Sequence, residues 1–312
     1  MSLASPRWAS RSRSVFIAAC AAVALLGLAA CKTSDDAAAA ATQMTATAQA
    51  LADYYAAVGK IVSNTEAIYR LNDQLEGKEY SPRSKAAIEG TKAELASRVK
   101  LAQDLAGLAG SFAGLAGSAA PADVAASAQS LDAEVHTLSS TTESSAEQQG
   151  LHDALTLLVK AIQERKEREA AKDMMDVAKN FSALFQKEKP IWISREQVYA
   201  ILSANLAKDL VDAGDTDNAA MLKVALDPFG LTMGALAEDT KTKLKSVAKA
   251  QIDVRRDAAE ADFASATEAM QTALDEMAKR IEAVAQEKPM AYRKPPLTIA
   301  NVKAWAAHAM AY

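Results

Sequence analysis

Residues 51–75, LADYYAAVGKIVSNTEAIYRLNDQL, show the pattern that decides the fold. Their apolar positions are spaced alternately three and four residues apart, which is the spacing of one face of an α-helix that packs against another helix. Thr65 and Asn72 interrupt this seam, and a polar residue there usually fixes the register between helices and occasionally serves a ligand. The seam comprises Leu51, Tyr54, Val58, Ile61, Thr65, Ile68, Asn72 and Leu75.

Similar spacing recurs through the rest of the chain. Half of the residues are apolar, many of them Ala, and aromatic residues make up only 5%. Ala, Leu, Lys, Glu and Gln dominate the long segments and favour helix, and no stretch alternates with the period of a β-strand. Further helices are expected over the following segments: Pro82 through Leu101, Pro121 to Leu138, a long segment that follows a turn at Ser139–Ser145 and runs to about Lys187, Ser194 to Gly214, Leu231 to Gln286, and Thr298 onward.

The segment from Leu231 to Gln286 carries the longest regular seam. Over 50 residues at about 1.5 Å each could reach roughly 80 Å. Such lengths predict an all-α protein, an elongated bundle of long antiparallel amphipathic helices with coiled-coil-like seams. The seam places an apolar residue every seven positions, with two more between them: Phe263, Met270, Met277 and Val284, with Leu274 and Ile281.

Two features predict interruptions in the middle of the chain. The sequence QERKERE, residues 163–169, is charged at every position but the first, so the helix there should bend or extend beyond its partners. Pro190 should break the chain, and Ser194 with Gln197 resembles a capping box that opens a new helix buried through Val198 and Ile201.

The N-terminal end has the order of a secretory signal. Three arginines and no acid precede the apolar run from Val15, which ends at Leu28-Ala29-Ala30-Cys31. These last four residues resemble the lipobox of bacterial lipoproteins. The resemblance implies diacylglycerol on the Cys31 thiol and cleavage between Ala30 and Cys31. It divides the chain into a signal peptide at 1–30, a tether at 31–41, a helical bundle at 42–288, and a proline-containing join with a C-terminal helix at 289–312.

Other interpretations of this end are weaker. The apolar run up to Ala30 is shorter than the roughly 20 residues that cross a bilayer. A signal peptide with a chance cysteine is the stronger alternative. Cys20 also follows a loosely similar pattern, but cleavage there would leave an apolar region of five residues, which is too short.

Lipidation of Cys31 has consequences for chemistry and location. Cys20 leaves with the signal, so the mature chain has no free thiol and no disulfide. Removing three arginines changes the net charge from −4 to −4 − 3 = −7, which argues against nucleic acid and anionic lipid headgroups as partners. Under the lipoprotein sorting rule, Lys32 after the cysteine suggests the periplasmic face of the outer membrane.

A charge-free repeat spans Leu105 to Pro121, where LAGLAGS is followed by FAGLAGS. One interpretation is a helix end whose glycines allow close packing. A second is a membrane element, because Gly110 and Gly114 form a GxxxG pair. A third is a flexible hinge. The candidate membrane or close-packing residues are Leu105, Gly107, Gly110, Phe112, Gly114, Leu115 and Gly117.

Catalytic and metal-binding patterns are weak. Of the three histidines, only His136 has a possible ligand one helical turn away, the carboxylate of Asp132. The acidic group around Gly214 (Asp212, Asp215, Asp217 and Asn218) lacks the glycine and glutamate of a calcium loop. We therefore expect no enzyme, no metal and no cofactor.

Two classes of function remain. The first is a lipid-anchored cell-envelope scaffold, spacer or binding module, with an unidentified envelope protein or a second copy as partner. The second is a membrane-active protein, similar to long helical pore-forming toxins, that uses residues 105–121. The absence of a site pattern favours the first.

Overall fold

The computed structural model describes residues 11–115, 121–141, 145–216, 226–231, 234, 237–286, 288 and 297–311, with side chains from Asp36 onward apart from a few at segment ends. Every regular element in these ranges is helical, which confirms the all-α prediction. The elements are α1 (Arg11–Leu75), α2 (Pro82–Leu115), α3 (Pro121–Thr141), α4 (Ala146–Gln163), α5 (Glu167–Ala213), the 3₁₀ turn η1 (Asp227–Phe229), α7 (Glu238–Ala285) and α8 (Leu297–Ala311).

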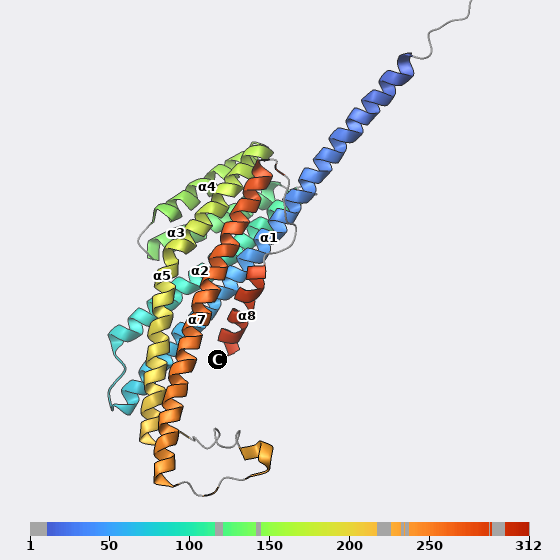
Figure 1. Ribbon diagram of the computed structural model, residues 1–312. Coiled ribbons are helices and arrows are strands. Elements are labelled where there is room, and N and C mark those ends of the chain that lie inside the picture. The colour runs from blue at the N-terminus through green and yellow to red at the C-terminus, as the bar shows by residue number, and fades with distance from the viewer. Residues whose placement is uncertain are drawn as a thin grey trace, which may run out of the picture.

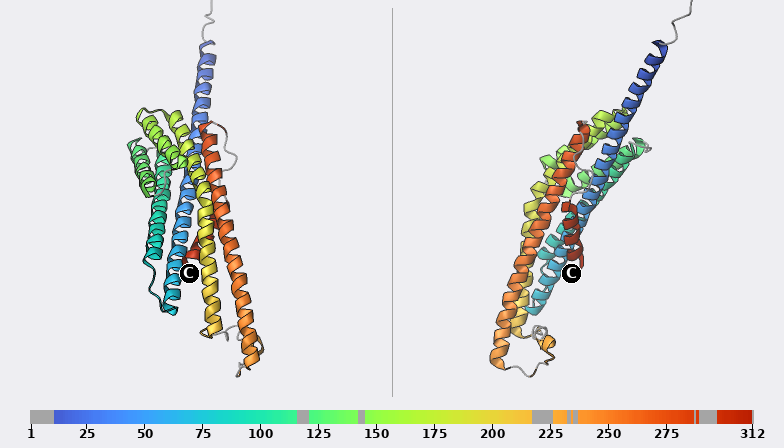
Figure 2. Two further views of the ribbon diagram at one scale, coloured as in Figure 1. Left: turned by 90° about the vertical axis from the view of Figure 1, so that its left-hand side faces the viewer. Right: turned by 45° about the vertical axis from the view of Figure 1, so that its right-hand side comes forward.

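The helices form an elongated bundle, as Figure 1 shows. Helix α1 pairs with α2, α5 pairs with α7, and the shorter α3 and α4 lie between α2 and α5. Helix α8 packs on α1 and α7. The first part of α1 projects beyond the other helices, and both views in Figure 2 show this. With 47 and 48 residues, α5 and α7 are each about 70 Å long.

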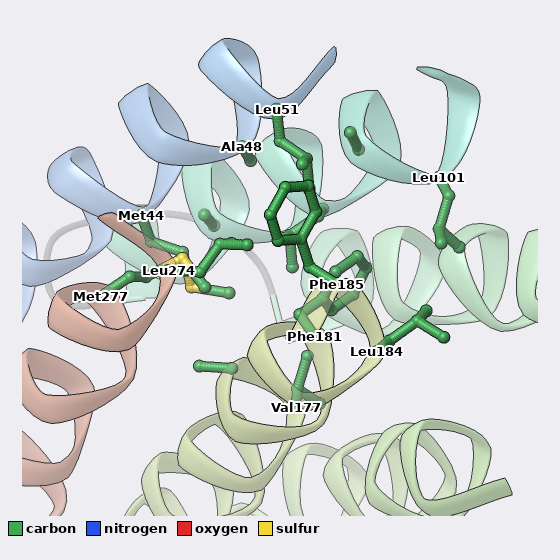
Figure 3. Packing of buried hydrophobic residues seen from close by; sticks show 14 of the residues in the cluster. Met44, Ala48, Leu51, Leu101, Val177, Phe181, Leu184, Phe185, Leu274 and Met277 are labelled. Carbon is green, nitrogen blue, oxygen red and sulfur yellow. The ribbon is translucent and has the colours of Figure 1, made fainter. Parts of the chain in front are cut away.

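The predicted seams form the core where α1, α5 and α7 meet. Figure 3 shows Met44 and Leu51 of α1 facing Phe185 of α5 and Leu274 of α7. The heptad residues of α7 are buried from Phe263 to Ile281, as predicted. In α3 five apolar residues spaced four and three apart are at most 2% exposed: Val124, Ala128, Leu131, Val135 and Leu138.

The polar residues of the α1 seam do not set the register. The Thr65 hydroxyl donates to the carbonyl of Ile61 at 2.9 Å, and the Asn72 amide donates to Glu76 at 3.2 Å, so both bond within their own helix. Helix α1 is tied to α7 by a 2.9 Å hydrogen bond between Tyr54 and Thr267. The expectation for Thr65 and Asn72 was therefore wrong.

The charged stretch at 163–169 marks a chain reversal between two helices rather than a bend in one. Helix α4 ends at Gln163, and α5 begins at Glu167 and runs back along α4. Arg165 in the turn has φ 56°, a left-handed conformation that is uncommon outside glycine. At the other end, Ser145 caps α4 in a capping box with Gln148. The expected turn at Ser139–Ser145 is shorter than predicted, because α3 continues to Thr141; residues 142–144 lie outside the described residues.

Helix α5 continues through Pro190, so the predicted break and the capping box at Ser194 were wrong. Proline removes one helical hydrogen bond, but buried residues on both sides, Glu188 and Trp192, hold the backbone helical through contacts with other helices. The expected buried face also differs. Val198 and Ile201 are exposed, while Ala200 and Ala204 are buried.

The segment boundaries differ in detail from those expected. Residues 31–41 belong to α1, and Ala40 and Ala41 are buried, so packing begins before residue 42. The short turn η1 and Gly230 precede the last long helix, and α7 begins at Glu238 rather than at the expected Leu231. Helix α8 begins at Leu297, one residue before the expected cap. The join at 289–296 lies outside the described residues.

Burial divides the bundle into two regions. From Ser63 to Glu94, a range described throughout, no residue is buried. Helices α5 and α7 bury few large side chains between residues 193 and 262. We call 63–94 together with the described parts of 193–262 the distal half, and the rest of the bundle the packed half. The distal half lies opposite the projecting part of α1 (Figure 1).

Candidate functional site

Six aromatic rings meet where α1, α5, α7 and α8 pack together. The Tyr54 ring lies 5.4 Å from both Phe185 and Trp305, and Phe263 meets Trp305 at 5.2 Å. Tyr55 and Trp192 complete the group, with ring centroids 6.0 Å apart. Edge-to-face pairs of this kind add about 0.5–1.5 kcal/mol beyond area burial. We call this group the aromatic junction; it lies in the packed half, next to the distal half.

A buried ion pair crosses the aromatic junction. The Arg98 guanidinium of α2 donates two hydrogen bonds to the Glu188 carboxylate of α5, at 2.9 and 2.8 Å. The Tyr55 hydroxyl donates to the same carboxylate at 3.1 Å. Both charged side chains are less than 10% exposed. Three helices therefore share one fully bonded carboxylate, which argues for a structural role rather than a reactive one.

The Trp192 ring contacts two guanidinium groups. The guanidinium carbons of Arg98 and Arg195 each lie 4.9 Å from its centroid. Arg195 also lies 3.6 Å from Glu94 of α2. Cation–π contacts and ion pairs here join α2 to α5. The group contains no nucleophile next to a base.

Glu196 is the most perturbed carboxyl group among the described residues. It is 5% exposed and lies just beyond the aromatic junction on α5. Burial, and secondarily the negative charge of Glu260 on α7, raise its pKa from 4.5 to about 7. Glu260 itself lies 3.6 Å from Arg256. Glu196 is therefore partly protonated near neutral pH and is the residue of this region most sensitive to pH.

A shallow groove of about 470 Å³ lies between α5 and α7 in the packed half. Its floor is the buried Gln271, whose amide nitrogen donates to Ser182 at 2.8 Å and to Asp275 at 2.9 Å. The Gln271 carbonyl oxygen is buried and has no partner among the described residues. Lysines and carboxylates alternate around the groove, and Lys179 already pairs with Glu282. Among the described residues, the groove has one unpartnered acceptor, which is buried, and no converging set of reactive groups.

The structure brings Asp132 close to a second histidine. Asp132, which lies one turn from His136 in α3, is 2.6 Å from His152 of α4. The two imidazole rings stack with centroids 5.7 Å apart. In the part of the chain that the structure describes, no three metal-ligating side chains come together.

Of the acidic group around Gly214, Asp212 has structural partners on α7. Gly214 ends α5 with φ 85°, the conformation expected of a glycine cap. The Asp212 carboxylate pairs with Lys249, and its carbonyl accepts from Lys245 at 2.9 Å. Asp215 follows the cap, and Asp217 and Asn218 lie outside the described residues. The cluster joins α5 to α7.

The apolar repeat begins as the packed end of α2. Leu105, Leu108 and Ala109 are buried, and Phe112 packs against the same core. Gly107 and Gly110 face outward, and a methyl group added at either would have no neighbour within 4 Å, so they are not close-packing points. Gly114 and Leu115 end the helix, and their side chains are not described; Gly117 lies outside the described residues.

The lipobox residues Ala30 and Cys31 lie in the projecting part of α1, where side chains are not described. Among the residues that the structure describes, no helix is both long and apolar enough to cross a membrane.

The distal half carries most of the exposed apolar side chains. Of eleven large apolar residues exposed in the described ranges, eight lie in it, and the packed half has three. The most exposed is Phe229, at 75%. No pattern in the sequence predicted this grouping. The eight residues are Leu71, Leu75, Val198, Ile201, Phe229, Leu231, Val247 and Val254.

Comparison with known proteins adds no family. The chain matches no protein-family model, no curated protein and no solved structure.

Proposed function

We propose that the protein is a lipid-anchored cell-envelope protein whose helical bundle acts as a scaffold or spacer and presents a binding surface. In this proposal Cys31 carries the lipid and the preceding residues are removed. The bundle then lies on the periplasmic face, and Lys32 favours the outer membrane over the inner. Its partner is another envelope protein or a second copy of the chain.

The observation that carries the proposal is the position of the exposed apolar side chains. Eight of eleven lie in the distal half, and Cys31 lies toward the opposite end of α1. The 45 residues from Cys31 to Leu75 span about 66 Å as one helix. Clustered apolar side chains on a folded surface are typical of protein interaction sites. A lipid at one end would hold such a surface away from the membrane.

Mass spectrometry of the mature protein tests the anchor. We expect a diacylglycerol modification on Cys31 and an N-terminus at that residue. A Cys31→Ser variant should lose the modification and leave the membrane fraction, whereas Cys20→Ser should change neither. An unmodified Cys31 in the membrane fraction would overturn the proposal.

In-cell photo-cross-linking tests the binding surface. A photoreactive amino acid at Val198 or Leu71 of the distal half should capture a discrete product. The matched control is Leu157 of α4, which is 53% exposed but lies in the packed half. Equal capture from all three positions would mean that the distal half is not a specific surface.

The membrane-active alternative is separated by a flotation test with the chain from residue 31 onward carrying Cys31→Ser, so that the apolar run of the signal peptide is absent. The proposal expects no binding to phospholipid vesicles and no dye release. Its support is the burial of Leu105 and Leu108 within the core. Flotation that is abolished by Gly110→Asp would instead favour the alternative.

A further inference from the structure

Two of the three histidines of the chain meet on the surface of the packed half, where α3 and α4 lie side by side (Figure 1). The imidazole rings of His136 and His152 have centroids 5.7 Å apart. His136 is exposed, and the side chain of His152 is 38% exposed, so both rings can be reached from solvent. Asp132 of α3 lies one helical turn before His136. We call these three residues the histidine cluster.

A hydrogen bond orients one ring of the histidine cluster. Nδ1 of His152 lies 2.6 Å from Oδ1 of Asp132. An ionised carboxylate accepts hydrogen bonds and cannot donate them, so the neutral His152 ring carries its hydrogen on Nδ1 and its lone pair on Nε2. Metal-binding histidines usually have this arrangement, in which a carboxylate holds the ring and makes it a more basic ligand. Nε2 of His152 is therefore prepared to bind a metal ion.

The separation of the two rings fits a shared ion. Zinc binds imidazole nitrogen at about 2.0–2.1 Å, which places two rings on one tetrahedral ion with their centres roughly 5 Å apart. The observed 5.7 Å is slightly longer, and the ring planes are inclined by 22°. His136 makes no hydrogen bond within the described part of the chain, and it is exposed. Its ring can therefore turn toward an ion held by His152.

The ligand atoms select the class of ion. Imidazole suits divalent ions such as zinc, copper and nickel, whereas calcium and magnesium require oxygen ligands. Among the described residues no group of three side chains is placed to hold an ion, and the Asp132 carboxylate is engaged by His152. Water would fill the remaining positions around the ion, so binding is weaker than in sites with four protein ligands.

We propose that His136 and His152 together bind a zinc ion between α3 and α4, with Asp132 as a positioning residue that orients His152. Spacing along the chain predicts no metal here, because the second imidazole comes from another helix, 20 residues beyond Asp132. The inference goes beyond the proposed function and does not depend on it. The bound ion would link α3 to α4 and stabilise the folded chain.

Isothermal titration calorimetry with zinc chloride tests the site. The protein is the chain from residue 31 onward carrying Cys31→Ser, which has no cysteine that could bind zinc. We expect one ion per chain. His136→Ala and His152→Ala should each remove measurable binding, whereas the matched control His308→Ala on α8 should not change it. Zinc should also raise the thermal unfolding midpoint of the unsubstituted chain and of His308→Ala only.

Two substitutions test the positioning role of Asp132. Asp132→Asn should weaken zinc binding by about tenfold, the usual cost of losing a carboxylate that orients a ligating histidine. Asp132→Glu should recover part of that loss, and stability to urea without zinc should be nearly the same for both, because the side chain lies at the surface. Equal zinc affinity in Asp132→Asn and the unsubstituted chain would contradict this role.

Three other results would overturn the zinc site. They are an absence of zinc binding by the unsubstituted chain, binding that survives His136→Ala or His152→Ala unchanged, and an equal loss in His308→Ala. Circular dichroism should be the same for all variants, so that a loss of binding cannot be assigned to unfolding. None of these results bears on acylation of Cys31, which judges the proposed function separately.

Discussion

The packed half and the distal half are built from the same long helices, yet they bury their side chains very differently. Along α1, Met44, Leu51 and Tyr54 are almost wholly buried, whereas nothing beyond Val62 is. Along α7 the buried heptad starts at Phe263, and Ala248 is the only residue buried before it in the described part of that helix. The helices of the distal half therefore form with little burial of side chains, whereas those of the packed half bury a continuous core.

This difference assigns stability to the packed half and the proposed binding surface to the distal half. The packed half holds the aromatic junction and the Arg98–Glu188 pair, so it should account for most of the free energy of unfolding. The distal half is two helix hairpins with exposed apolar side chains, and regions with few buried contacts open most easily. The following substitutions test the comparison, and each is measured as a change in the free energy of unfolding by urea titration.

The largest loss is expected from Glu188→Ala in the packed half. It leaves the Arg98 guanidinium buried without its carboxylate, which should cost about 3–5 kcal/mol. Replacing both partners, with Arg98→Met and Glu188→Leu, should recover much of that loss. If Glu188→Ala were as stable as the unmodified protein, the Arg98–Glu188 pair would have to be hydrated in solution.

Leu274→Ala should cost somewhat less, about 2–4 kcal/mol, because it opens a cavity in the core between α1, α5 and α7. The matched control is Leu75→Ala in the distal half, where the leucine is 58% exposed. Similar losses at the two positions would contradict the division of the bundle.

Glu196→Gln should stabilise the protein at high pH, because the pKa of Glu196 is raised by burial to about 7. Below about pH 4.5 the carboxyl is protonated in both the folded and unfolded chains and costs nothing. Between pH 4.5 and 7 ionisation favours the unfolded chain, so folding loses stability as pH rises. We expect a gain of about 3 kcal/mol at about pH 8 and none at about pH 4.

The effect of Glu260→Gln sharpens this prediction. Burial is the larger cause of the raised pKa of Glu196 and Glu260 is the smaller one, so Glu260→Gln should give a smaller gain over the same pH range. A gain under acidic conditions, or one independent of pH, would show that Glu196 acts through packing rather than through its charge.

The smallest effect is expected from Ile201→Ala and Leu71→Ala in the distal half. Both side chains are more than 40% exposed, so each substitution should change stability by less than about 0.5 kcal/mol. The same variants should lower capture of the binding partner. Large stability losses here would mean that the distal half is a second core.

Much of the fold could be predicted because seam spacing is a local property of the sequence. The seams of α3 and α7 are buried where the spacing placed them. Pro190 and residues 163–169 were misjudged because tertiary contacts override local preference, and a charged run does not distinguish a bend from a reversal. Arg98 and Glu188 are 90 residues apart, so no local pattern pairs them.

A signal for two different faces of α7 was nevertheless present in the sequence. Val247 and Val254 are seven apart, and so are Phe263 and Met270, but the step from Val254 to Phe263 is nine. Two heptad series out of phase on one helix indicate two different faces. Which face is covered depends on where α1 and α8 end, and only the structure gives that.

The unbroken course of α1 also has a mechanical consequence. A pull on its projecting N-terminal part is directed along the helix axis, since α1 runs from Arg11 to Leu75 without interruption. The load would shear α1 past α2, α5, α7 and α8 together, so the contacts of the packed half would resist in parallel instead of opening one after another. A force applied at that end would therefore be shared by all of these helix contacts at once.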